Sequence, residues 1–268
     1  MTQTMPSDAD TAVQPPADTA QDVVDPSGGA NDDYPWDDFD PVAYFNHNYR
    51  YLRDDDREIL GRVRDFFAPL ELPADARGID VGTGSNLYPA LSMLPLCRRI
   101  LLWERSRSNV TWLRKQVRRH GPAWDQFWDH LAEADRYRRM REPWTELPER
   151  AKVRCANVFQ LPEQEFDVGT MFFVAESIST RVHQFHDAVY RFLGSLRPGA
   201  PFAAAFMHNS KGYRVGEIDF PAVPVSTTHV RQCVADAGRI HELYEIDKGD
   251  KPLRDDYDGM ILVTGWRR

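Results

Sequence analysis

The stretch GIDVGTGSNLYPALSM, residues 78–93, joins a short apolar run containing Asp80 to two glycines one residue apart. Gly82 and Gly84 let the backbone turn sharply and approach a ligand closely. An apolar pattern with helical spacing follows from about Tyr88. In an open α/β sheet, ligands bind at the carboxyl ends of the strands, near the point where the strand order switches. The stretch therefore predicts a buried strand, a ligand-binding turn and a helix.

Strands and helices alternate along the rest of the chain. Strands are expected at residues 77–82, 98–104, 152–158, 166–177, 201–207, 240–246 and 259–266. Helices are expected at residues 54–70, 86–96, 106–119, 123–140, 182–196 and 226–238, and Ser106 or Ser108 is a plausible cap for the third of them. The alternation predicts an α/β fold with a mostly parallel sheet, and the final pair of strands predicts an antiparallel edge.

The acidic charge of the chain is concentrated near its start. The formal net charge is -8, and residues 1–40 hold ten Asp and no Lys, Arg or Glu. That segment contributes about -10, so the remainder carries about +2, which is -8 minus -10. Residues 1–35 are too poor in large apolar groups to bury much surface, so we expect a disordered acidic tail. One domain should follow at 36–268, with a lid and helix at 36–70 and the core at 77–268.

Composition argues against several other classes of protein. Cys97, Cys155 and Cys233 are far apart, have no metal-binding spacing and are odd in number, which suits a reducing cytoplasm. No apolar run approaches the roughly eighteen residues of a membrane span, and no signal-peptide pattern opens the chain. The basic stretches at 114–120 and 136–141 interleave with acids, which favours charged helix surfaces over nucleic-acid binding. We expect a cytoplasmic monomer without membrane, nucleic-acid or metal partners.

Residues after the second and third strands narrow the choice of ligand. Glu104 lies about twenty residues after Gly84, where an acid can accept hydrogen bonds from two ribose hydroxyls. Leu87 occupies the third glycine position of a dinucleotide turn, which argues against a pyrophosphate there. S-adenosylmethionine has a ribose and no pyrophosphate. Asn157 could read its adenine amino group beside the backbone N–H of Val158; the alternatives are an ordinary turn residue and a purely structural glycine connection.

Several motifs resemble the family of nicotinamide, phenylethanolamine and thioether methyltransferases, within the class I S-adenosylmethionine-dependent methyltransferases. These motifs are FDPVAYFNHNYRYL at 39–52, GIDVGTGSNLYPALS at 78–92, LLWERSRSNVTWL at 101–113, GSLRPGAPF at 194–202 and GYRVGEIDFPAVPVSTTHVRQCVADAG at 212–238. The first is similar to the family's tyrosine-bearing N-terminal lid, and the last resembles its hairpin and final helix. Across residues 39–267 the resemblance implies a Rossmann-like class I methyltransferase sheet, helices on both faces, a helical lid and S-adenosyl-L-methionine as cofactor.

The resemblance also implies roles for individual residues. Tyr49 and the glycine turn would hold the methionine part of the cofactor, Tyr88 would close over it, and Glu104 would bind the ribose. Asn157 stands where the family usually has Asp, which keeps an acceptor and removes a charge. The implied cofactor-binding residues are Tyr49, Asp80, Gly82, Gly84, Tyr88, Glu104, Asn109, Asn157, Val158 and Phe172, with Phe173 as a further wall.

The substrate side departs from the family. Its nicotinamide members place an Asp at the end of the fifth strand, where this chain has Phe206, so nicotinamide is not the expected acceptor. The implied catalytic candidates are Tyr44, Glu176 and His208. The implied substrate-binding residues are Tyr44, Phe206, Ser210, Tyr213 and Glu217. Two of these have simpler interpretations, because Glu217 could pair with Arg214 and His208 could be a solvated loop residue.

Methyl transfer is an in-line displacement with a neutral leaving group, so most of the rate can come from positioning the nucleophile. An amine must react unprotonated, and a nearby carboxylate or histidine could take its proton. Aromatic faces between Tyr34 and Tyr51 would suit a cationic acceptor and would let this segment act as a lid. We expect N-methylation of a small molecule. The alternatives are O-methylation of a small phenol and a non-catalytic S-adenosylmethionine-binding protein.

Overall fold

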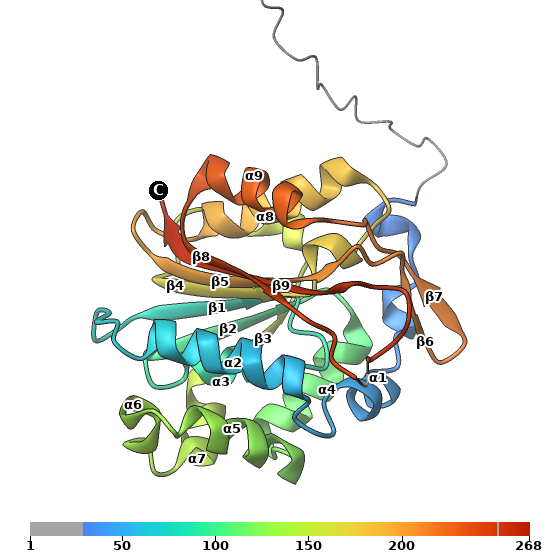
Figure 1. The fold of residues 1–268 in the computed structure, drawn as a ribbon. Helices are drawn as coiled ribbons and strands as arrows, with labels where there is room; N and C mark the ends of the chain where they lie inside the picture. Colours follow the sequence, from blue (N-terminus) through green and yellow to red (C-terminus); the bar gives the residue numbers. More distant parts are fainter. Residues whose placement is uncertain (1–28, 251) are drawn as a thin grey trace, which may run out of the picture.

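The computed structural model describes residues 29–250 and 252–268 and has a central seven-stranded sheet (Figure 1). In spatial order its strands are β3 (Ala151–Cys155), β2 (Arg99–Glu104), β1 (Arg77–Val81), β4 (Val168–Phe172), β5 (Pro201–His208), β9 (Gly259–Arg267) and β8 (Gly238–Ile246). The strand order reverses between β1 and β4. This switch point is where an open α/β sheet binds its ligands.

The pairing of the strands confirms the expected mostly parallel sheet. β1 pairs in parallel with β2 and β4, and the parallel pairing continues to β3 on one side and to β5 on the other. β9 runs antiparallel to both β5 and β8, which makes the predicted antiparallel edge. Every residue of β4 is buried, as expected for a central strand covered on both faces.

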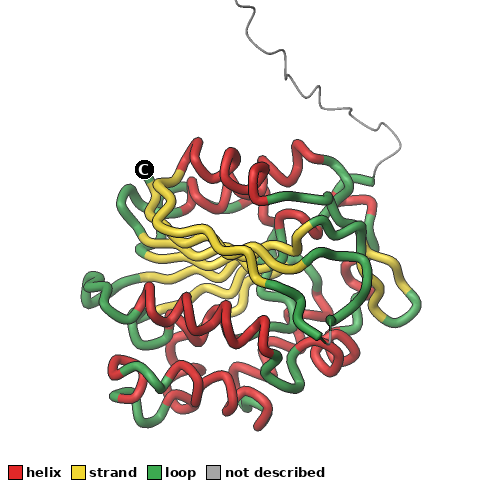
Figure 2. The backbone as a smooth tube through the Cα atoms, viewed as in Figure 1, coloured by secondary structure: helices red, strands yellow, loops and turns green. Residues whose placement is uncertain are grey.

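Helices cover both faces of the sheet, as Figures 1 and 2 show. One face carries α8 (Val182–Ser195) and α9 (Thr227–Ala237), and the other carries α2 (Asp54–Phe67), α3 (Tyr88–Met93) and α4 (Arg107–Arg118). Beyond α2 and α3 lies a further layer of α5 (Asp125–Leu131), α6 (Asp135–Arg138) and α7 (Pro143–Arg150). Ser106 is the N-cap of α4, with its hydroxyl accepting from the Asn109 N–H at 3.2 Å, which confirms one of the two expected caps.

Several expected elements differ in extent from the structure. The single helix expected at 123–140 is broken into a 3-10 turn, α5 and α6, because the chain bends so that Tyr137 is buried and donates to the Ser92 carbonyl at 2.7 Å. The helix α7 begins with Pro143 at its first turn and was not predicted at all. The strand expected at 166–177 ends at Phe172, since Phe173 has a left-handed φ of 60°.

The N-terminal part of the described chain is folded against the domain. Residues 1–28, most of the expected acidic tail, lie outside the described residues. Residues 29–35 were also expected in the tail, but they include a 3-10 turn at Asn31–Asp33, and a second follows at Trp36–Asp38. Helix α1 (Pro41–Asn48) comes next. Ordered structure therefore begins before the expected boundary at residue 36.

A two-stranded hairpin, β6 (Tyr213–Val215) and β7 (Ile218–Phe220), lies beside this N-terminal segment (Figure 1). The ring of Phe220 stacks on Trp36 at 5.1 Å and contacts Phe39 at 5.2 Å. The expected hairpin and the expected lid segment are thus packed together at one side of the sheet. In the described part of the chain, no helix has the length and apolar character needed to cross a membrane.

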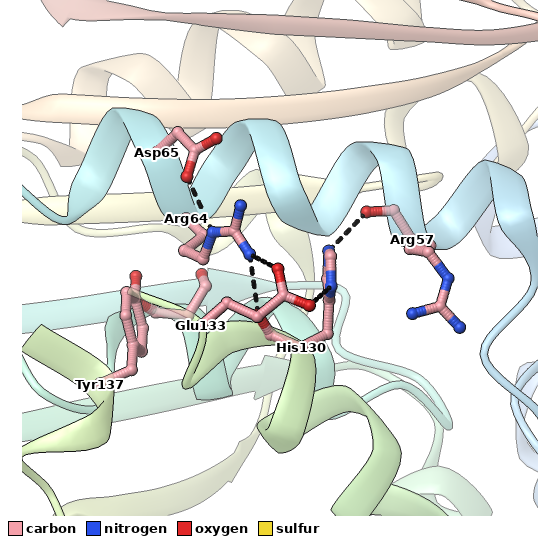
Figure 3. A network of polar contacts seen from close by, with 7 residues as sticks. Arg57, Arg64, Asp65, His130, Glu133 and Tyr137 are labelled. Atoms are coloured by element: carbon pink, nitrogen blue, oxygen red, sulfur yellow. Dashed lines mark hydrogen bonds and ion pairs between the residues drawn. The ribbon is translucent and has the colours of Figure 1, made fainter. Parts of the chain in front are cut away.

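A polar network fastens α2 to the outer helical layer (Figure 3). Arg64 on α2 donates to the His130 carbonyl at 2.9 Å and also pairs with Glu133 and Asp65. The His130 ring in turn contacts the Arg57 carbonyl at 3.0 Å and Glu133 at 3.1 Å. The Arg64 guanidinium and the His130 ring lower the pKa of Glu133 below its usual range.

Replacing Arg64 by Ala should lower the free energy of unfolding by about 1–2 kcal/mol, because a charge-assisted hydrogen bond to the His130 carbonyl in a partly buried site is lost. The matched control is Arg138→Ala, which breaks an exposed i,i+3 pair with Asp135 and should cost less than about 0.5 kcal/mol. Urea unfolding midpoints of the two variants measure the difference. Equal urea midpoints for the Arg64 and Arg138 variants would show that the network contributes no more to stability than an exposed ion pair.

Candidate functional site

The glycine turn predicted from the opening stretch connects β1 to α3. Gly82 has a φ of 66° and Gly84 a φ of 57°, a region that residues with a Cβ rarely adopt. The Gly82 N–H donates to the Trp103 carbonyl at 2.7 Å, which fixes the turn against β2. A Cβ at Gly82 would lie 2.5 Å from a methyl of Val174, whereas a Cβ at Gly84 would meet only the Gly82 carbonyl at 3.7 Å. Gly82 therefore serves packing, and Gly84 leaves open space in front of the turn.

The two glycines should respond differently to substitution. Gly82→Ala should destabilise the protein by about 2–4 kcal/mol, since it combines left-handed strain with a clash against Val174. Gly84→Ala should cost only about 1–2 kcal/mol, and its larger effect should fall on ligand binding. Thermal unfolding and calorimetric titration of each variant with S-adenosylhomocysteine would separate these effects. An equal loss of stability in both variants would contradict the distinction.

A cleft of about 770 Å³ lies in front of this turn, at the carboxyl ends of the strands near the switch point. Most of the predicted site residues line it. They are Tyr44, Tyr49, Gly82, Gly84, Glu104, Asn109, Asn157, Val158, Phe172 and Tyr213, with Phe173 beside them. The structure thus brings together side chains from the lid segment, the glycine turn and the ends of β2, β3 and β4.

Glu104 is the buried acid at the end of β2. One of its oxygens accepts the Gly84 N–H at 2.8 Å and the other accepts the Ser106 N–H at 2.7 Å. Burial raises the pKa of Glu104 above its usual range, and the hydrogen bonds from Ser106, Gly84 and Asn109 oppose this rise. A carboxylate has about four lone-pair sites, more than the two short backbone bonds use, and Glu104 lines the cleft where a ligand can donate to it. The group fits a vicinal diol such as that of a ribose.

The far end of the cleft is lined by Asn157, Val158 and Asn31. The Asn157 side-chain oxygen accepts the Phe159 N–H at 3.1 Å and the Asn31 side-chain N–H at 3.2 Å. The indole N–H of Trp103 donates to the Asn157 carbonyl at 2.9 Å. Asn157 therefore caps a turn, which is one of the two interpretations left open by the sequence, and it also lines the cleft.

Two of the predicted cofactor residues lie behind the wall of the cleft instead of lining it. Asp80 is buried and accepts from the Thr170 hydroxyl at 2.7 Å, and burial raises its pKa to about 7. Tyr88 is also buried, donates to Asp56 at 2.9 Å and packs edge-on against Phe172 at 5.7 Å. Both residues support the turn and the walls, because they fill the space beneath the residues that a ligand would touch.

A second, smaller cavity adjoins the cleft; we call it the acceptor cavity. Both spaces are lined by Tyr44, Tyr49, Phe173, Ser177 and Tyr213. The acceptor cavity is further lined by Asn48, Arg53, Asp56, Met207, Leu253, Arg254 and Met260. An outer groove shares Tyr44, Tyr213 and Arg254 with this cavity and connects it toward the surface.

Asp56 supplies a titratable group to the acceptor cavity. It lies in the first turn of α2, is buried and accepts a hydrogen bond from the Tyr88 hydroxyl at 2.9 Å. Burial, together with the neighbouring Asp55, raises the pKa of Asp56 to about 7, although the Tyr88 hydrogen bond and Arg53 oppose the rise. A carboxyl group with this pKa can exchange a proton near neutral pH.

The junction between the two spaces contains a strained residue. Phe173 directly follows β4 with a φ of 60°, and its N–H donates to the Ala205 carbonyl at 2.7 Å. A left-handed conformation is costly for a bulky side chain and is typically retained at functional sites. Phe173 thus projects an aromatic wall where the cleft meets the acceptor cavity, next to the rings of Tyr44 and Tyr213, which lie 6.1 Å apart.

The structure does not bring the remaining predicted substrate residues into either space. Phe206 is fully buried on the opposite face of the sheet against Phe185, at 5.9 Å. His208 ends β5, where its carbonyl accepts the Asp258 N–H at 2.9 Å, and Ser210 accepts from Arg254 at 2.7 Å. These placements correct the expectation that Phe206, His208 and Ser210 face the substrate.

The two predicted glutamates also lie outside both spaces. Glu176 is buried under the acceptor cavity, accepts the Met207 N–H at 2.8 Å, and has its pKa raised to about 7 by burial. Glu217 is exposed at the tip of the β6–β7 hairpin. Arg214, its expected partner, pairs instead with Asp219 at 2.9 Å. Glu176 is therefore a supporting residue at most, and Glu217 is a surface residue.

The lining residues that sequence reasoning missed include Asn31, Asp56 and Arg254. Asn31 lies in a segment whose composition resembles a disordered tail. Asp56 belongs to a run of three Asp that also suits the start of a helix, and Arg254 lies in a charged loop. No local pattern distinguishes these residues from surface polar groups, because their burial arises from contacts with distant elements.

Comparisons with known proteins agree with the geometry. The sequence model of the NNMT/PNMT/TEMT family matches residues 29–267. A comparison with curated proteins finds no match. Among solved structures, a SAM-dependent methyltransferase from Methanosarcina mazei is similar with a TM-score of 0.50 and 11% identity, covering 73% of this chain and 98% of that one.

Two further solved structures are similar at low identity. The N-methyltransferase NodS from Bradyrhizobium japonicum WM9, in complex with S-adenosyl-L-homocysteine, has a TM-score of 0.47 and 12% identity, covering 84% of this chain and 98% of that one. A SAM-dependent methyltransferase from Aquifex aeolicus has a TM-score of 0.47 and 15% identity, covering 85% and 98%. The family match spans nearly the whole described chain, so the protein belongs to the NNMT/PNMT/TEMT family and is an S-adenosylmethionine-dependent methyltransferase.

Proposed function

We propose that this methyltransferase transfers the methyl group to a nitrogen of a small molecule held in the acceptor cavity. The observation that carries the proposal is the junction at Tyr44, Phe173 and Tyr213, where this cavity meets the cleft beside the titratable Asp56. The lining of the cavity combines aromatic, apolar and charged side chains, a composition typical of a site for a small molecule.

S-adenosylmethionine, when bound, supplies an electrophilic methyl group on a sulfonium sulfur. In our assignment the turn at Gly82 and Gly84, together with Tyr49, holds the amino-acid end of the cofactor. Glu104 accepts from the ribose hydroxyls with Asn109 in support, and the adenine lies toward Asn157 and Val158 with Phe172 as a wall. This order follows the cleft from the glycine turn to the end of β3. The acceptor cavity then lies beside the amino-acid end.

Positioning supplies most of the rate in this proposal, because a neutral leaving group needs no stabilised anion. The rings of Tyr44, Tyr49 and Tyr213 surround the junction and offer π-faces to a cationic or quaternising nitrogen. Asp56 takes the proton of an ammonium group, so the nitrogen reacts with its lone pair free. Leu253 and Arg254 cover the outer side of the cavity and limit the access of water.

The test is formation of S-adenosylhomocysteine with panels of small amines, N-heterocycles and phenols, each compared with the acceptor-free rate. Turnover with an amine or a heterocycle supports the proposal. Turnover with phenols alone would replace it by O-methylation. A useful control is Leu253→Trp, which narrows the acceptor cavity and leaves the cleft untouched. This variant should bind S-adenosylhomocysteine normally while its methyl transfer falls.

A further inference from the structure

Asn31, in the N-terminal segment, carries a buried acceptor that has no partner in the described part of the chain. Its side chain lines the adenine end of the cleft, and the residue is only 2% exposed. The side-chain N–H donates to Asn157 at 3.2 Å, but the side-chain oxygen accepts no hydrogen bond. Buried polar atoms are almost always paired, so an unpaired oxygen at the wall of a ligand cleft points to a donor on the ligand.

The orientation of the Asn31 amide is fixed by its neighbours. The Asn157 oxygen accepts the Phe159 N–H at 3.1 Å, so it must be the acceptor end of that amide. Asn31 can therefore present only its NH₂ group to Asn157, because a flipped amide would oppose two oxygens. The same contacts use both lone pairs of the Asn157 oxygen. Asn157, the adenine reader expected from the sequence, is thus already saturated.

The main chain of Asn31 is held as firmly as its side chain. Its N–H donates to the Gln184 side chain on α8 at 2.9 Å, and its carbonyl accepts the Trp36 indole N–H at 2.7 Å. The next residue, Asp32, pairs with Arg105 at 2.7 Å, just after Glu104 at the end of β2. These bonds place the segment across the ends of β2 and β3, over the adenine end of the cleft.

We propose that Asn31 is the residue that recognises the 6-amino group of the cofactor's adenine, with Asn157 as a positioning residue that orients the Asn31 amide. The inference rests on the cofactor orientation given under the proposed function. The adenine amino group is a donor, and the Asn31 oxygen is the unfilled acceptor beside Val158. Recognition of the base therefore comes from the N-terminal segment, in addition to the strand ends of the core.

The experiment compares two ligands by calorimetry, S-adenosylhomocysteine and its analogue with hydrogen in place of the 6-amino group. Wild type should bind the parent ligand at least about tenfold more tightly than the analogue, about 1.4 kcal/mol. In Asn31→Ala this ratio should fall below about twofold, because the acceptor is gone. Asn157→Ala should also reduce the ratio, because it removes the acceptor that orients the Asn31 amide.

A purely structural role of Asn31 would weaken both ligands equally and leave the ratio unchanged, which would overturn the inference. An unchanged affinity of Asn31→Ala for the parent ligand would overturn it as well. The proposed function is tested separately by turnover and by binding of S-adenosylhomocysteine to wild type. A failure of the proposed function would appear as missing turnover or missing binding in wild type. A failure of this inference would appear as an unaltered ratio of the two affinities in Asn31→Ala.

Discussion

Replacing Asp56 by Asn is expected to lower kcat of methyl transfer to an amine by about 10²- to 10⁴-fold, the usual contribution of a general base. The affinity for S-adenosylhomocysteine should stay unchanged, because Asp56 lines the acceptor cavity and not the cofactor cleft. Asn has the same shape and can still accept from the Tyr88 hydroxyl. The loss would thus report the missing proton acceptor.

The pH dependence of the rate gives an independent test of this role. A base acts only when deprotonated, and burial raises the pKa of Asp56 to about 7. The wild-type rate should therefore rise about tenfold per pH unit below pH 7 and level off above it. Asp55→Asn removes a like charge that raises the pKa of Asp56, so the rising limb should move to lower pH. Tyr88→Phe removes a stabilising hydrogen bond, so the limb should move to higher pH.

These variants separate a base from a bystander. If Asp56→Asn retained its kcat within about threefold and kept the rising limb, another group would have to take the proton. Glu176 would be the first candidate, since it is buried beneath the same cavity with its pKa raised to about 7. The pH profile of kcat in Glu176→Gln would then show the lower kcat and the missing rising limb. If the acceptor is a phenol instead of an amine, the same base would take the proton of the phenol hydroxyl, so the same variants would again change kcat.

The cofactor side of the site could be predicted from sequence because its signals are local. The turn is predicted by Gly82 and Gly84, which directly follow an apolar strand. The position of Glu104 is predicted by its place at the end of the next strand. The mostly parallel sheet follows from the alternation of strands with helices. The structure adds that Asp80 and Tyr88 support the site from behind, which depends on burial that no local pattern specifies.

On the acceptor side, Tyr44 and Tyr213 were predicted, but the contribution of β5 was not, because one residue along a strand changes the face. Successive side chains of β5 point to opposite faces, so Met207 lines the acceptor cavity while Phe206 packs against Phe185. Sequence reasoning placed Phe206 at the substrate. Asp56 was missed for a related reason, since acids at the start of a helix are common and only the contact with distant Tyr88 makes this one special.

Replacing Glu104 by Ala should weaken binding of S-adenosylhomocysteine by about 100-fold, about 2.7 kcal/mol, since hydrogen bonds to a charged group contribute about 1.5–3 kcal/mol each. Calorimetric titration measures the change. Glu242→Ala, which alters an exposed acid on β8, is the matched control and should leave the Kd unchanged. A Kd within threefold of wild type for the Glu104 variant would remove Glu104 from the ribose site.

Glu104→Gln should be nearly as damaging as the alanine change. Each oxygen of Glu104 accepts a backbone N–H, from Gly84 at 2.8 Å and from Ser106 at 2.7 Å. A glutamine has one oxygen, so its NH₂ group must oppose one of these donors. The glycine turn would then lose a bond on which its shape depends. An acid at this position therefore has two tasks, to hold the glycine turn and to bind the ribose. An amide has only one oxygen, so it can make only part of the hydrogen bonds that each task needs.

The two tasks can be measured apart with the analogue of S-adenosylhomocysteine that lacks the 2′-hydroxyl. If Glu104 binds the ribose directly, wild type should discriminate against the analogue by about tenfold, and Glu104→Ala should bind both ligands alike. If Glu104 acts only by holding the Gly84 turn, the variant should lose affinity for both ligands while keeping the wild-type ratio. Because Glu104 lines the cleft and its two backbone bonds use only part of the acceptor capacity of the carboxylate, the first outcome is the one expected.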